Sequence, residues 1–258
     1  MLRQKPVLFS VALALSCSLA HAASPFAGKW KYNAAKSKLT GTTDSVAAAG
    51  SNAWKFTYGT FSWTIKADGT DQNTPFGRTV ALKTTPTSWV LTNKSNGKLT
   101  STETWVLSAD GKSMTRTSTG KREDGSPFTE TVIVKRTAGG KGFEGTWEAS
   151  DVKIAFTQMS VDDNGSAGIT AFFPDRAVKV PLLFNGKDSP ISGPKIPPGA
   201  TTNTKVVSPR KLEITEKLAG KLMDSETWEV SSDGKTFTYT EKDPGVDALM
   251  VIVLDKQQ

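Results

Sequence analysis

The chain contains an internal repeat. The segment beginning at Lys98 reads KLTSTETW, and the segment beginning at Lys221 reads KLMDSETW. The matches SADGK and SSDGK follow them, and the two copies lie 123 positions apart without a gap. Each half also opens with a Gly-x-Trp signature, FAGKW from Phe26 and FEGTW from Phe143. Because this period is far longer than a solenoid unit, each copy is expected to be a complete domain with its own core.

Short turn signals divide each copy into strand-like runs. Asp68-Gly69, Asn96-Gly97 and Asp110-Gly111 punctuate the first copy, and Asn164-Gly165 and Asp233-Gly234 punctuate the second. Such pairs supply the positive φ angles of tight hairpins between runs of β-branched and aromatic residues. The pattern predicts an all-β chain in which each copy is an eight-stranded antiparallel up-and-down meander, closed into a barrel to remove its edges. In the first copy, the expected strands are 28–32, 53–58, 61–67, 78–83, 88–93, 98–107, 113–119 and 128–136.

The N-terminus has the charged, apolar and small-residue order of a secretory signal. We therefore expect residues 1–22 to be a signal peptide, 23–137 the first barrel, 138–142 a short linker and 143–258 the second barrel. The expected location is periplasmic or secreted. An alternative is a lipoprotein acylated at Cys17. No run approaches the 18 or so apolar residues of a transmembrane helix.

Cleavage at Ala22 removes Cys17 and His21, the only cysteine and the only histidine. Without them, a catalytic triad, a thiolate nucleophile and a Cys/His zinc site are excluded, so we expect no cofactor and no metal, and an enzyme is disfavoured. Removing Arg3 and Lys5 from the 32 basic residues leaves 30 against 25 acidic residues. This mild excess permits an anionic envelope component as a partner but does not indicate nucleic acid.

Alternation of side chains predicts an aromatic interior in the first copy. An eight-stranded barrel is wide enough either to be filled by such rings or to hold one small ligand, so both alternatives stay open. The corresponding strands of the second copy are more aliphatic. The expected ligand-binding residues are Trp54, Phe56, Tyr58, Trp63, Trp89, Glu103, Trp105, Glu226 and Trp228.

A carboxylate is expected to point inward in each copy. Glu103 shares its strand face with Leu99, Trp105 and Leu107, and Glu226 occupies the same place in the second copy. An unpaired buried charge costs several kcal/mol, so the pKa should be raised unless a cation lies close. Three interpretations remain: a buried ion pair or an outward-turning bulge, a polar anchor for a ligand amine or hydroxyl, and a catalytic acid or base.

The Gly-x-Trp openings Gly28-Lys29-Trp30 and Gly145-Thr146-Trp147, each followed by a meander, resemble those of the lipocalin-like (calycin) barrels. The string from Gly28 to Leu39 is also similar to the opening of small exported bacterial lipocalin-like proteins with no assigned function. The resemblance implies two tandem eight-stranded antiparallel up-and-down (lipocalin-like) barrels. It also implies that Trp30 closes one barrel end, with Arg136 or Lys135 stacked on its ring.

These patterns favour an exported protein that binds a small apolar or aromatic ligand inside a β-barrel. A first alternative is a non-catalytic envelope interaction protein with plugged barrels. A second is an isomerase or hydrolase that uses an interior glutamate. A cavity of about 300 Å³ or more, lined by Trp54, Trp63 and Trp89, would favour ligand binding.

Overall fold

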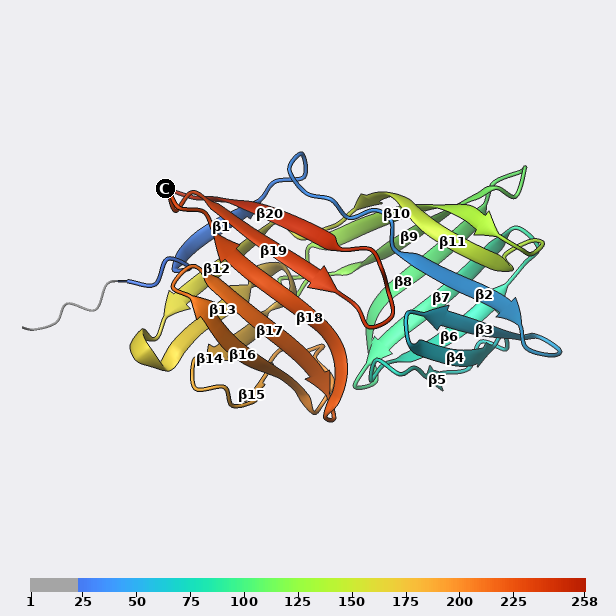
Figure 1. The fold of residues 1–258 in the computed structure, drawn as a ribbon. Coiled ribbons are helices and arrows are strands. Elements are labelled where there is room, and N and C mark those ends of the chain that lie inside the picture. The colour runs from blue at the N-terminus through green and yellow to red at the C-terminus, as the bar shows by residue number, and fades with distance from the viewer. Residues whose placement is uncertain (1–22) are drawn as a thin grey trace, which may run out of the picture.

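The computed structural model describes residues 23–258. In this part of the chain, twenty strands and two short 3-10 helices are present. The strands form two ten-stranded antiparallel sheets, each rolled into a nearly closed barrel (Figure 1). The expected signal peptide at 1–22, with Cys17 and His21, lies outside the described residues.

The two sheets have the same layout. From edge to edge, the first barrel contains β4 (Phe61–Lys66), β3 (Ala53–Tyr58), β2 (Thr43–Ala48), β11 (Gly145–Lys153), β10 (Pro127–Ala138), β9 (Ser113–Lys121), β8 (Lys98–Leu107), β7 (Ser88–Ser95), β6 (Thr79–Thr84) and β5 (Gln72–Asn73). The second contains β14 (Val178–Leu183), β13 (Gly168–Phe173), β12 (Gln158–Asp163), β1 (Gly28–Tyr32), β20 (Met250–Lys256), β19 (Thr236–Lys242), β18 (Lys221–Val230), β17 (Lys211–Leu218), β16 (Ala200–Ser208) and β15 (Ser189–Pro190). The 3-10 helices are η1 (Gly165–Ala167) and η2 (Pro174–Arg176).

The strand count of ten corrects the predicted eight. In the first copy, the prediction omits β2 and β5. β2 has the sequence TDSVAA, in which Val46 is the single large apolar residue, so the alternation that reveals a strand is weak. β5 has only two residues and pairs with the start of β6. The all-β class and the antiparallel arrangement are confirmed.

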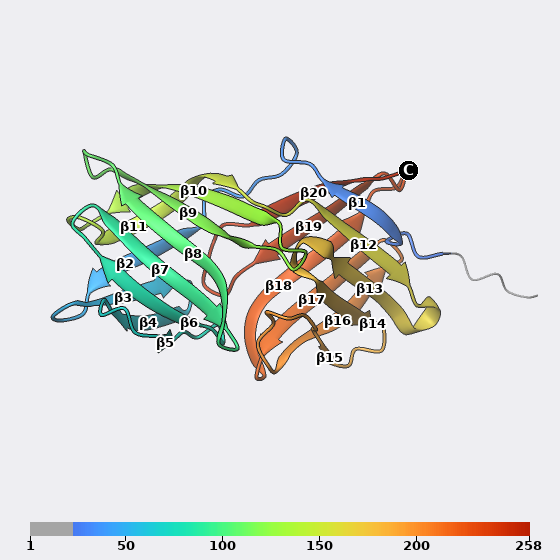
Figure 2. The same cartoon turned by 180° about the vertical axis from the view of Figure 1, so that it is seen from behind.

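The two sequence copies exchange their first strands. β1, from the first copy, lies between β12 and β20 of the second barrel. β11, from the second copy, lies between β10 and β2 of the first barrel. The first barrel therefore comprises strands from β2 to β11, and the second comprises β1 together with β12 to β20 (Figures 1 and 2). This partition differs from the expected domains 23–137 and 143–258, because β11 belongs to the first barrel and β1 to the second.

The short linker explains the exchange. Only the Gly-rich segment 139–144 separates β10 from β11, so the nearest partner that β11 can reach is β10 itself, as in a hairpin. β11 then fills the place beside β10 that the first strand of the same copy would take in a self-contained barrel. β1 is left to fill the equivalent gap beside β20.

Each Gly-x-Trp tryptophan closes a barrel end, and the basic residue beside its ring comes from the barrel that receives the exchanged strand. Trp30 and Trp147 are fully buried. The Arg136 guanidinium carbon lies 4.2 Å from the ring centre of Trp147, and the Lys256 ammonium lies 5.1 Å from that of Trp30. The expected stacking of Arg136 or Lys135 on Trp30 is therefore wrong, because Trp30 belongs to the other barrel.

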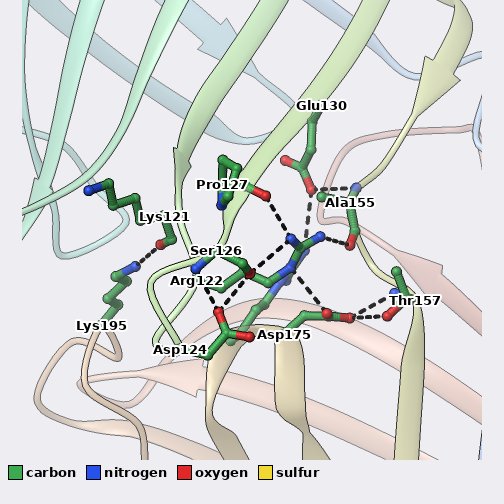
Figure 3. Close-up of polar contacts among 11 residues, drawn as sticks. Lys121, Arg122, Asp124, Ser126, Pro127, Glu130, Ala155, Thr157, Asp175 and Lys195 are labelled. Carbon is green, nitrogen blue, oxygen red and sulfur yellow. Dashed lines mark hydrogen bonds and ion pairs between the residues drawn. The ribbon is translucent and has the colours of Figure 1, made fainter.

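The barrels meet through matching ends. The β3–β4 turn contacts the β19–β20 loop, where the Thr60 N–H donates to the Pro244 carbonyl at 2.8 Å and the Tyr58 hydroxyl donates to Asp243. The β9–β10 turn contacts η2, where Arg122 forms an ion pair with Asp175 at 3.1 Å and donates to the Ala155 carbonyl at 3.2 Å (Figure 3). The two interiors therefore approach each other end to end.

Gly59 offers a test of this contact. It has a φ of 53°, and a Cβ atom there would lie 2.1 Å from the Pro244 carbonyl oxygen. We expect Gly59→Ala to lower the free energy of unfolding by clearly more than the roughly 1 kcal/mol that a positive φ costs. Gly97→Ala is the matched control, since its φ is 73° and nothing lies within 4 Å of the added carbon. Equal losses for the two variants in urea unfolding would contradict this packing.

Candidate functional site

The interior of the first barrel contains a cavity of about 300 Å³. This volume lies at the lower end of the range for small-molecule sites. Its wall is largely apolar and aromatic, with a few polar side chains from several strands. The lining residues are Asp44, Ser45, Phe56, Thr57, Tyr58, Trp63, Ile65, Thr74, Phe76, Arg78, Val80, Leu91, Asn93, Glu103, Trp105 and Arg116.

Aromatic rings cover one side of the cavity. Phe56 and Trp63 face each other from β3 and β4, with ring centres 5.7 Å apart and planes 14° from parallel. Phe76 meets Trp63 edge to face at 5.3 Å, and Trp105 meets Phe56 edge to face at 6.0 Å. Because these rings hold one another, their exposed surfaces form a rigid wall that suits a flat or apolar guest.

Two of the three tryptophans expected to line a cavity pack elsewhere. Trp63 lines it, whereas Trp54 and Trp89 do not. Trp89 is 2% exposed and stacks on Phe143 with ring centres 4.3 Å apart, and Trp54 lies 4.7 Å from Trp89. Phe143 enters this barrel with the exchanged strand, so Trp54 and Trp89 fill the end that Trp147 closes.

Glu103 lines the cavity, and a β-bulge precedes it in β8. Asn93 pairs with Ser101 but the next residue, Lys94, pairs with Leu99, so one residue of β8 is extra. The bulge turns Leu99 to the outer surface, where it is 58% exposed. The expectation that Leu99 shares the inward face of Glu103 is therefore wrong. The same shift occurs in β18, and Leu222 is 42% exposed.

The Glu103 carboxyl is tied to its own strand. The Trp105 indole N–H donates to Glu103 Oε1 at 2.5 Å. Burial raises the pKa of Glu103, and the nearby Arg116 and the Trp105 bond oppose that rise only in part. Glu103 therefore adopts its neutral form more readily than an exposed glutamate does. A neutral carboxyl can donate as well as accept a hydrogen bond.

Arg116 and Asp44 form a partly buried ion pair that the sequence pattern does not predict. Both terminal nitrogens of Arg116 donate hydrogen bonds to the Asp44 carboxylate, and the Nη2–Oδ1 distance is 2.8 Å. Its guanidinium carbon also lies 4.0 Å from the ring centre of Trp105. Asp44 comes from β2, the strand with the weakest sequence signal. The two charges offset each other, and the pair fixes the ring of Trp105 from behind.

The equivalent region of the second barrel is acidic. Glu226 is 7% exposed and accepts from the Trp228 indole at 2.8 Å, as Glu103 does from Trp105. Tyr239, which pairs with Trp228 as Arg116 pairs with Trp105, donates to Glu226 at 3.0 Å. The position of the cation in the first barrel is therefore occupied by a phenol in the second. The nine expected site residues thus divide into three groups: Phe56, Tyr58, Trp63, Glu103 and Trp105 line the cavity, Trp54 and Trp89 pack at the end closed by Trp147, and Glu226 and Trp228 lie in the other barrel.

A carboxylate cluster surrounds Glu226. Oxygen atoms of Glu216, Asp224 and Glu226 lie within 4.8 Å of one another, and those of Asp224, Glu241 and Asp243 form a second such group. Burial and mutual repulsion raise the pKa of Asp224 to about 8 and that of Glu216 to about 7, and that of Glu226 is also raised. Carboxylates this close share protons. Their donor atoms are of the kind that hard divalent cations prefer.

Comparisons of the chain with models of protein families, with curated proteins and with solved structures find no match. Within residues 23–258, no helix has the length and apolar character needed to cross a membrane.

Proposed function

We propose that this chain is an exported protein that binds one small apolar or aromatic molecule inside its first barrel. The observation that carries the proposal is the cavity of about 300 Å³ whose wall combines Phe56, Trp63 and Trp105 with a few polar groups. A concave, mostly apolar site with few oriented polar groups is the usual form of a small-molecule site. The secretory pattern at residues 1–22 supports a periplasmic or secreted location.

The polar groups favour binding over catalysis. Glu103 and Trp105 already bond to each other, and Arg116 is paired with Asp44. A general base needs a partner that orients it toward a substrate proton. Here the neighbours of Glu103 hold it against the wall, so we assign it the role of a fixed polar contact.

The proposal is tested with phenylnaphthylamine, an uncharged aromatic probe that becomes fluorescent in apolar sites. We expect saturable binding and a loss of about fivefold in affinity for Trp63→Ala, because a lost ring contact is worth about 1 kcal/mol. Phe173→Ala is the control, since it removes a half-buried ring from the second barrel. If the intact protein does not bind the probe, and carries no small molecule when purified from its own host, the binding function is wrong.

A further inference from the structure

The charges in the cavity wall identify a chemical class of ligand. Four lining residues are ionic in type: Asp44, Glu103, Arg78 and Arg116. Asp44 and Arg116 form the partly buried pair described above, so their charges cancel each other. Glu103 is held by the Trp105 indole and lies beside Arg116. Arg78 is therefore the remaining charge of the wall.

Arg78 has no acidic partner among residues 23–258. Its backbone carbonyl accepts bonds from Thr74 N–H at 2.8 Å and from Thr74 Oγ1 at 3.0 Å, which closes the turn before β6. No ion pair or side-chain hydrogen bond occupies its guanidinium in this part of the chain. Partial desolvation lowers the pKa of Arg78, although its side chain is exposed to solvent, and Arg176 of η2 adds to this effect. Arg176 itself has an acidic partner, Glu130, at 3.9 Å.

The second barrel fixes the position of this turn. Gly77, next to Arg78, lies so close to Pro197 that an added Cβ would be 2.7 Å from the proline ring. Phe76, which precedes Gly77, meets Trp63 edge to face and packs at a tilt on Phe61. Arg78 therefore joins the cavity lining directly after a segment that packs on the second barrel and on the aromatic wall, and its own side chain is exposed to solvent. An arginine so placed suits an oxyanion, since its planar donors match a carboxylate or sulfonate.

We propose that the ligand is a small aromatic acid, with its rings against Phe56 and Trp63 and its anionic group on Arg78. This inference rests on the proposed binding function and adds the charge of the ligand to it. A cationic ligand is disfavoured because the wall offers no free carboxylate: Asp44 is paired, and Glu103 is bonded and next to Arg116. An anion would give Arg78 the counter-charge that no residue among 23–258 provides.

The test compares two probes with the same rings. Anilinonaphthalene sulfonate carries one negative charge, and phenylnaphthylamine is its uncharged parent. We expect the intact protein to bind both, and Arg78→Gln to weaken the sulfonate about tenfold while leaving the neutral probe unchanged. Arg78→Lys should restore part of the loss. Lys66→Gln is the matched control, because it removes one positive charge from the outer, exposed face of the same barrel.

Each outcome has a separate meaning. If both probes bind and Arg78→Gln changes neither, the acid proposal is overturned while the binding function stands. If neither probe binds the intact protein, the acid proposal is overturned, and the binding function is overturned with it when the protein purified from its own host carries no small molecule. Should Arg78→Gln not fold, the intact protein decides the question alone. Added salt should then weaken the sulfonate and not the neutral probe, and equal salt dependence would overturn the proposal.

Discussion

Replacing Trp30 by alanine is expected to destabilise the second barrel, although Trp30 belongs to the first sequence copy. Trp30 has no exposed surface, lies 5.3 Å from the ring of Phe237 and donates its indole N–H to the Phe26 carbonyl at 2.9 Å. Truncation of a buried tryptophan costs about 3 to 5 kcal/mol. Because the lost contacts lie in the core of the second barrel, the second barrel should lose the stability.

Trp147→Ala is the mirror experiment. Trp147 is equally buried and donates to the Phe143 carbonyl at 3.0 Å, but its ring belongs to the core of the first barrel. Hydrogen exchange read by peptide separates the two effects. Trp30→Ala should speed exchange in β12 and β20, and Trp147→Ala should speed it in β10 and β2. The opposite pattern would show that each copy keeps its own first strand.

The strand exchange marks the limit of sequence reasoning in this chain. The Gly-x-Trp pattern predicts a strand that closes a barrel end, and both Trp30 and Trp147 do so. The pattern is the same whichever barrel receives the strand, because the two copies provide nearly equivalent places for it. The choice depends on the length of the 139–144 segment between β10 and β11, which a residue pattern does not evaluate.

Site residues were predictable on strands where inward and outward side chains alternate regularly, and unpredictable where this alternation breaks. Period-two alternation places Phe56, Trp63 and Trp105 inward, and all three line the cavity. The bulge in β8 reverses the face of Leu99, since one extra residue shifts the pattern. Asp44 was missed because its strand has little apolar alternation. Its pairing with Arg116, 72 positions away, joins strands that are not adjacent in the sequence.

A second expected result with a large effect is that the protein loses stability as the pH rises from 5 to 8. The folded state raises the pKa of Asp224 to about 8 and of Glu216 to about 7, chiefly by burial, whereas the same groups in an unfolded chain titrate near pH 4. Between these values, the folded state holds protons that the unfolded state has released. The contribution is therefore fully present below about pH 4 and is lost as the pH rises through the folded pKa values.

The size of this effect follows from the number of protons. One proton held only by the folded state makes the free energy of unfolding fall by about 1.4 kcal/mol per pH unit, so one such proton between pH 5 and 7 gives about 3 kcal/mol.

Asp224→Asn should reduce the slope and stabilise the protein at pH 8, because it removes a charge from the cluster. Asp188→Asn is the control: Asp188 is exposed and paired with Lys217 at 3.0 Å, so its loss should leave the slope unchanged. Urea unfolding at several pH values measures each slope. A stability that is flat or rising from pH 5 to 8 would mean that the carboxylates of the second barrel ionise freely, and hence that water or a cation reaches them.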